Sequence, residues 1–202
     1  STKNIMKAHL YMGKAAVENI IKNIKPMNVR VLHIATHGFF EPVDNSAKKK
    51  FDSNLSFDEV NNLSRSGLFM AGAQNFLNGE EIPNDADDGI ITAQEISTLD
   101  LRGVDLVALS ACETAKGDIT SDGVLGLQRG FKKAGVNSIL MSLWNVDDDA
   151  TCRLMTEFYA NWLGKKMSKH SALEAAKQTV RLTHGWENPK YWSAFILLDG
   201  LD

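Results

Sequence analysis

The stretch VDLVALSAC, residues 104–112, indicates the fold class, because a short run that is apolar apart from Asp105 ends in small and polar residues. A strand that is apolar at successive positions is typical of a parallel sheet covered on both faces. Similar runs occupy residues 29–35, 136–143 and 195–198, with amphipathic stretches between them. This alternation predicts an α/β protein, a three-layer α/β sandwich with a mostly parallel sheet.

The stretches between the strands predict helices and loops. Residues 13–24 place apolar side chains on one side of a helix, and residues 123–134 do the same before Gly135, a residue typical of a helix C-terminus. Thr92 with Glu95 three residues later predicts a helix that begins with a capping box. The remaining expected segments are helices opened by residues 147–149 and by Ser168 or Ser171, an apolar run at 67–73, a Gly- and Asp-rich insert at 75–89 and a long loop at 39–66.

Bulk composition excludes several classes of protein. The chain has 202 residues, 44% of them hydrophobic, and a net charge of -3, which fits one globular domain and argues against direct nucleic-acid binding through a basic face. No apolar run reaches the roughly 20 residues that a membrane span needs. Two cysteines are too few for a disulfide framework, so a reducing compartment, the cytoplasm, is predicted.

Two reactive side chains follow two of the predicted strands. His37 comes after residues 29–35, and Cys112 comes after residues 104–109. The carboxyl ends of parallel strands gather functional groups at one edge of a sheet, and a histidine can assist a thiolate nucleophile there. The backbone N–H groups of Gly38 and Cys112 are candidate donors for an oxyanion hole. The alternative for a cysteine at this place is a buried, inert side chain.

Two motifs around these residues resemble those of a known family. VLHIATHG, residues 31–38, resembles the histidine motif of CHAT domains, which belong to the caspase and separase group of peptidases. LVALSACET, residues 106–114, resembles their cysteine motif. Four further segments match in order: DGIITAQEI at 88–96, GVLGL at 123–127, SLWNVDD at 142–148 and YWSAF at 191–195.

The resemblance implies a caspase-like α/β sandwich that hydrolyses peptide bonds in a protein substrate, with no metal or other cofactor. Cys112 would attack the scissile carbonyl and His37 would protonate the leaving amine. The family's domain begins with a strand of which residues 1–10 supply at most the end, so residues 1–202 are expected to form one peptidase domain truncated at its N-terminal edge. Because members often carry helical repeats in front of this domain, a regulatory region or partner protein is also expected.

The segment after Trp144 bears on substrate preference. Separase-like peptidases place an acidic residue of the primary specificity pocket here, which by resemblance makes Asp148, and after it Asp147, candidates to bind Arg or Lys beside Trp144. The alternative is that both carboxylates stabilise the start of a helix through its dipole.

Two further patterns are each better explained without a function. Asp85, Asp87 and Asp88 could bind calcium, but a solvated turn is favoured because the ligand set is incomplete. Residues 48–50, all lysine, together with Arg65 could form a self-processing loop, and a solvated loop is the alternative.

His33 is predicted to be a core or sheet-facing histidine, and Cys152 to pack on its helix.

Three functions remain after these considerations. The first is an active cysteine endopeptidase, and the second is an inactive caspase-like scaffold or protein-interaction module. The third is a nucleotide-binding protein, suggested only by a faint phosphate-loop pattern at Gly123 and Gly126.

Overall fold

The central sheet holds the strands on which the candidate site depends. The computed structural model of the chain describes residues 7–25, 28–40, 63–79, 87–110 and 121–199. The sheet contains β1 (Val31–Ile34), β5 (Leu106–Leu109), β6 (Ser138–Ser142) and β7 (Phe195–Leu198), in the order β1-β5-β6-β7. The first three strands run parallel and β7 runs antiparallel to β6. The predicted α/β sandwich with a mostly parallel sheet is therefore confirmed.

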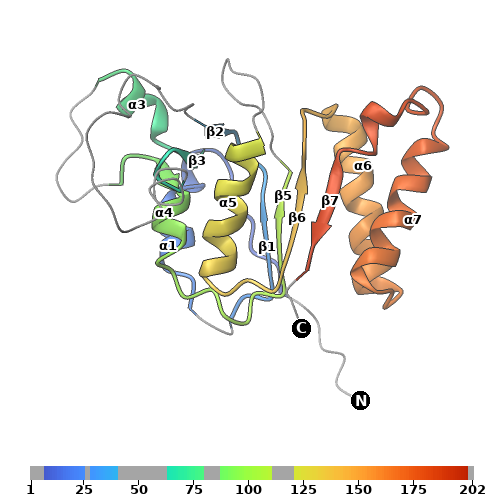
Figure 1. Ribbon diagram of the computed structural model, residues 1–202, viewed down its shortest axis with the longest axis horizontal. Helices are drawn as coiled ribbons and strands as arrows, with labels where there is room; N and C mark the ends of the chain where they lie inside the picture. Colours follow the sequence, from blue (N-terminus) through green and yellow to red (C-terminus); the bar gives the residue numbers. More distant parts are fainter. Residues whose placement is uncertain (1–6, 26–27, 41–62, 80–86, 111–120, 200–202) are drawn as a thin grey trace, which may run out of the picture.

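Helices cover both faces of this sheet (Figure 1). On one side lie α1 (Glu18–Lys22), α4 (Ala93–Ile96) and α5 (Ser121–Lys133), and on the other lie α6 (Asp148–Tyr159) and α7 (Lys169–Arg181). Every residue of β5 is buried, because its side chains alternate between two apolar clusters. Val107 and Leu109 join the cluster around α4 and α5, whereas Leu106 and Ala108 join the cluster around α6 and α7.

A second, antiparallel sheet lies beside the first. It consists of β2 (Gly38–Phe40), β3 (Ser66–Phe69) and β4 (Ile90–Thr92), in that order. The apolar run expected at residues 67–73 thus contributes only its first part to a strand. Helix α3 (Ala73–Leu77) begins at the end of this run and extends into the Gly- and Asp-rich insert expected at residues 75–89. An apolar run predicts that a segment is buried, but it does not predict which strands that segment pairs with, because the pairing depends on tertiary structure.

The helix expected at residues 13–24 is broken in the structure. A 3-10 turn covers Gly13–Ala15, and α1 begins only after Val17, whose backbone is extended. The carbonyl of Ala16 accepts a hydrogen bond from the N–H of Ala71 at 2.9 Å, so this carbonyl serves a neighbouring segment and not a continuous helix. The apolar spacing alone did not predict that a neighbouring segment would bind this carbonyl and interrupt the helix.

Predicted helix ends agree better with the structure. The Thr92 hydroxyl accepts from the N–H of Glu95, and the Glu95 carboxylate accepts from the N–H of Thr92, which confirms the capping box. Gly135 has a φ of 97°, as a glycine after a helix C-terminus should. Ser168, not Ser171, caps α7. The last helical turn after α6, Ala160–Gly164, is π-helical, and a 3-10 turn covers Pro189–Tyr191.

Gly130 sets how closely α5 approaches α4. A Cβ at this position would lie 2.6 Å from the carbonyl oxygen of Ala93 and 3.2 Å from its Cα, so backbone would have to move. Gly164 is the opposite case, because no heavy atom lies within 4 Å of the place its Cβ would take.

The substitution Gly130→Ala is therefore expected to lower the free energy of unfolding by up to about 2 kcal/mol. Overpacking costs about 1–3 kcal/mol and outweighs the gain of about 1 kcal/mol from better helix propensity. Urea denaturation measures the change, and Gly164→Ala is the control, expected to be neutral or slightly stabilising. A Gly130→Ala variant as stable as its control would contradict this account of the α4–α5 contact.

Candidate active site

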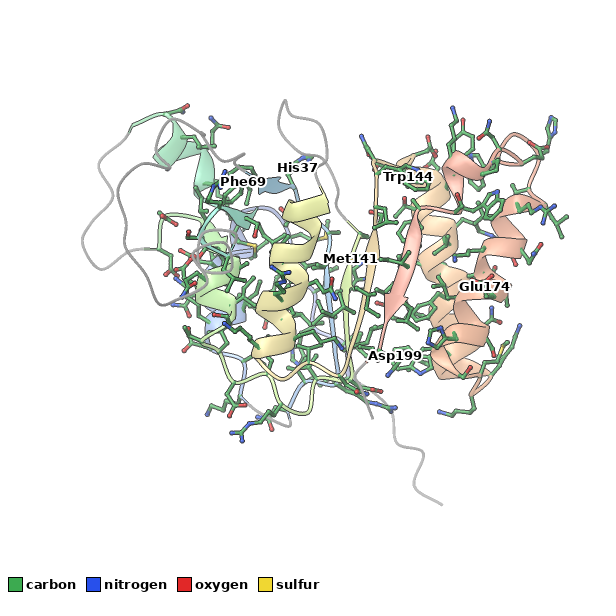
Figure 2. The ribbon with its side chains drawn as sticks, in the orientation of Figure 1. His37, Phe69, Met141, Trp144, Glu174 and Asp199 are labelled. Atoms are coloured by element: carbon green, nitrogen blue, oxygen red, sulfur yellow. The ribbon has the colours of Figure 1, made fainter. Side chains whose placement is uncertain are left out.

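His37 lies at the carboxyl end of β1, in the link to β2. Its carbonyl accepts from the N–H of Phe69 at 2.8 Å, and the hydroxyl of the preceding Thr36 donates to the carbonyl of Phe69. Both bonds tie the link between the two sheets to β3. Figure 2 shows His37 at the same end of the molecule as Trp144, above the central sheet.

The end of β5 lies beside the end of β1. The two strands pair in parallel with Ile34 opposite Leu109, and the N–H of Ser110 donates to the carbonyl of Ile34 at 3.2 Å. Cys112, the predicted nucleophile, and its predicted oxyanion N–H lie outside the described residues. The structure thus describes the chain on the β5 side up to Ser110, two residues before Cys112.

A cleft of about 560 Å³ opens at these strand ends. Polar side chains from three strand ends and from the start of α6 face into it. Its lining residues are Ala35, Thr36 and His37 after β1, Ser110 after β5, Ser142 at the end of β6, Asn145, Val146 and Asp147 before α6, and Asp148 and Thr151 on α6. This arrangement brings His37 together with both acidic candidates.

The two candidate carboxylates have different local roles. The Asp147 side chain accepts from the N–H of Ala150 at 3.0 Å and so caps the N-terminus of α6. Asp148 lies in the first turn, exposed, and lines the cleft. Trp144 is half-buried, and its indole N–H donates to the carbonyl of Lys190 at 3.1 Å. The lining of the cleft does not include Trp144.

Gly38 pairs with Leu68 of β3 in the antiparallel register. The flanking bond from the N–H of Phe69 to the carbonyl of His37 makes this a non-hydrogen-bonded pair, in which the N–H groups point away from the partner strand. The amide of Gly38 is therefore turned away from β3.

A chain of hydrogen bonds runs beside the cleft, and the sequence did not predict it. Nε2 of His33 lies 2.9 Å from Oγ of Ser110, and Nδ1 lies 3.2 Å from the hydroxyl of Tyr159 at the end of α6. His33 faces the sheet side covered by α6, as its position in the strand predicts. A signal was present, because every second residue from Val31 points to the same face as Ala108 and Ser110.

A larger hollow of about 1980 Å³ runs along the outer side of β1. It is lined by β1, residues 7–13, α1 and α3, and it meets the cleft at residues 35–37. His33 and Tyr159 line this groove but not the cleft, whereas Ser110 and Asp148 line only the cleft. We place the candidate chemistry in the smaller cleft, because three strand ends and the start of α6 converge there.

The acidic candidates for calcium binding take part in ordinary contacts. The ammonium of Lys22 lies 3.1–3.2 Å from carboxylate oxygens of Glu18, Asp87 and Glu95, and burial raises the pKa of Glu18. Asp88 accepts from the N–H of Ile90, while Asp85 lies outside the described residues. Within the described ranges, no three His, Cys, Asp or Glu side chains group as a metal site requires.

The structure also locates most of the remaining residues that the sequence singled out. Gly123 and Gly126 lie inside α5 and not in a loop before it, so the phosphate-loop interpretation is wrong. Cys152 is exposed on α6, where packing was predicted. The lysines at 48–50 lie outside the described residues, and Arg65 directly precedes β3. None of the helices that the structure describes is long and apolar enough to cross a bilayer.

A mostly parallel sheet between two helical layers, with a histidine and a polar cleft at its carboxyl edge, defines an α/β protein of the kind that places its active site at strand ends. A family model of the CHAT domain matches residues 2–200. The chain therefore belongs to the CHAT domain family, part of the caspase-like cysteine peptidase group.

Two tetratricopeptide repeat proteins are similar to part of the chain. Tetratricopeptide repeat protein 28 of Mus musculus is 34% identical over 110 residues, which cover 54% of this chain and 4% of that protein. Its counterpart of the same name in Homo sapiens is 32% identical over 130 residues, which cover 58% of this chain and 5% of that protein. The chain thus spans a small fraction of the length of these relatives.

Burial lowers the pKa of His33 below its ordinary value, because the charged imidazolium would lose solvation beside Tyr159 and the sheet. In an NMR pH titration, we expect its ring to take up a proton below the value of about 6.5 typical of an unperturbed histidine. The unfolded chain then binds the proton at a higher pH, so this residue destabilises the fold as the pH falls below about 6.5. A midpoint above 6.5 would contradict the stated role of burial.

Proposed function

We propose that this chain is a cysteine endopeptidase in which Cys112 is the nucleophile and His37 the acid–base partner. The observation that carries the proposal is the parallel pairing of β1 with β5, Ile34 opposite Leu109. Two residues of chain span at most about 7 Å, so Cys112 stays within that reach of Ser110, which lines the same cleft as His37.

The reaction follows from these groups. The Cys112 thiolate attacks the scissile carbonyl carbon, and the negative charge moves to the carbonyl oxygen. The N–H groups of Gly38 and Cys112 are the proposed donors to that oxygen, and the orientation of the Gly38 amide away from β3 supports this role. His37 donates a proton to the leaving amine as the C–N bond breaks. A water then hydrolyses the thioester, with His37 accepting its proton.

We further propose that Asp148 selects a basic residue before the cut. Its carboxylate lines the cleft from α6 and has no helix-capping role, whereas Asp147 already caps that helix. An Arg or Lys side chain entering the cleft would gain a charge-assisted hydrogen bond from Asp148. Trp144 lies outside the cleft lining, and its proposed contribution is indirect: the bond from its indole N–H to the carbonyl of Lys190 restrains the segment that leads to α6.

A second function is favoured by the names of the relatives. Both are tetratricopeptide repeat proteins, and repeat arrays provide extended binding surfaces. On this alternative the chain is an inactive caspase-like scaffold within a larger assembly. Helical repeats, in the same chain or a partner, would equally serve to regulate an active peptidase. We place either form in the cytoplasm, because two cysteines are too few for the disulfide framework typical of oxidising compartments.

Substitution of Cys112 by alanine is expected to abolish peptide cleavage, since the nucleophile is lost while the helices and sheet keep their packing. Cleavage of a fluorogenic peptide library and thermal unfolding, measured on the same preparations, give activity and fold. Cys152→Ser is the matched control, because this second cysteine is exposed on α6 and lies outside the cleft lining.

The control is expected to cleave at the wild-type rate, and a thiol-reactive peptide probe should label wild type and Cys152→Ser but not Cys112→Ala. Cleavage by Cys112→Ala equal to that of wild type would refute the nucleophile. A folded wild-type chain that neither cleaves nor labels, with or without added helical-repeat region, would favour the scaffold.

Substitution of Asp148 by asparagine is expected to lower kcat/KM for substrates with Arg or Lys before the cut by about tenfold or more, because a hydrogen bond to a charged group contributes about 1.5–3 kcal/mol. Substrates with uncharged residues at that position should change little. Asp149→Asn removes the same charge from the same exposed helical turn, outside the cleft lining, and serves as the control. Equal losses in both variants would reduce Asp148 to a general electrostatic role.

A further inference from the structure

Three side chains connect the outer side of β1 with the cleft. Tyr159 stands at the C-terminal end of α6, His33 lies on β1, and Ser110 follows β5. The distances of 3.2 Å and 2.9 Å make one continuous chain of hydrogen bonds from phenol to imidazole to hydroxyl. Only the last member, Ser110, lines the cleft.

The number of donors and acceptors gives this series of hydrogen bonds a direction. Nδ1 of His33 is the hydrogen-bond partner that the structure gives the Tyr159 hydroxyl, so the phenol is best satisfied when it donates to that nitrogen. Nδ1 is then an acceptor, and in a neutral imidazole the proton must sit on Nε2. Nε2–H donates to Oγ of Ser110, which leaves the hydroxyl proton of Ser110 for another acceptor.

The surroundings of His33 and Tyr159 favour the neutral form of each side chain. Burial lowers the pKa of His33 and raises the pKa of the Tyr159 phenol. Neither the imidazolium nor the phenolate is therefore favoured near neutral pH. The ring of Tyr159 is also fixed by its neighbours, since it contacts Phe158 at 5.2 Å and Trp162 at 6.3 Å between ring centroids.

In the segments that the structure describes, Oγ of Ser110 has no second hydrogen-bond partner. Because Ser110 lines the cleft together with His37 and Asp148, its hydroxyl can donate to a group that enters the cleft. A peptide that occupies the cleft carries an acceptor at each backbone carbonyl.

We propose that the Ser110 hydroxyl is a substrate-binding group that donates to a backbone carbonyl of the bound peptide, and that His33 and Tyr159 are positioning residues that act through it. The proposal rests on the proposed peptidase function and adds a residue to its site. It assigns a backbone contact, which holds peptides of any sequence, next to the side-chain selection proposed for Asp148.

A double-mutant cycle tests this role in the full chain with a fluorogenic peptide that the wild type cleaves. Loss of one neutral hydrogen bond lowers kcat/KM by about two- to twelvefold, so Ser110→Ala and Tyr159→Phe are each expected to fall in that range. The double variant should be no slower than Ser110→Ala alone, because Tyr159 acts only through that hydroxyl. The loss should appear mainly as a raised KM.

Controls separate this effect from general packing. Tyr191→Phe removes a hydroxyl from another half-buried tyrosine outside the cleft lining and should leave kcat/KM unchanged. Ser110→Thr keeps a hydroxyl and should retain more activity than Ser110→Ala. Losses that multiply in the double variant, or wild-type kcat/KM in Ser110→Ala, would overturn the proposal while leaving the peptidase intact.

A wild-type chain as inactive as Cys112→Ala would instead remove the proposed function, and the substrate contact with it. The direction of the hydrogen-bond chain has its own readout, because ¹⁵N shifts of the His33 ring distinguish the two tautomers. We expect the proton on Nε2, and a proton on Nδ1 would overturn the assignment of Ser110 as donor to the cleft.

Discussion

The parallel pairing of β1 with β5 is the interaction on which the candidate site depends. It aligns Ile34 with Leu109, so that the chain leaves both strands at the same edge of the sheet. The bond from the N–H of Ser110 to the carbonyl of Ile34 extends this pairing one residue beyond the strand. Because β5 is buried on both faces, its register is fixed: a shift by one residue would exchange the side chains of its two apolar clusters.

The sequence predicted those parts of the fold that local chemistry determines. The strand at residues 195–198 and the capping box of Thr92 were correct, because apolar runs and caps act over a few residues. The break before α1 was missed, since it depends on a hydrogen bond from the remote Ala71 to Ala16. The separate antiparallel sheet was missed for the same reason, as the partners of β3 lie far from it in the chain.

The sequence also predicted part of the candidate site and missed the contacts that depend on tertiary structure. His37 was found from its place after a strand, and the structure places it in a polar cleft with Asp148. Ser110 and Tyr159 were not singled out, because their shared contact with His33 joins three segments that only the folded chain brings together. Cys112 remains a prediction from its motif and from the position of Ser110.

Helix α6 connects the two halves of the site. Its first turn carries Asp148 into the cleft and its last residue, Tyr159, holds His33, so one rigid element of about 18 Å sets both positions. The helix is anchored through buried side chains such as Leu154 and Phe158, which pack with α7. The two ends of a helix cannot move independently. Anything that shifts the layer of α6 and α7 would therefore change both the cleft and the hydrogen bonds that join Tyr159, His33 and Ser110. Regulation by a neighbouring region could therefore act on the cleft without entering it.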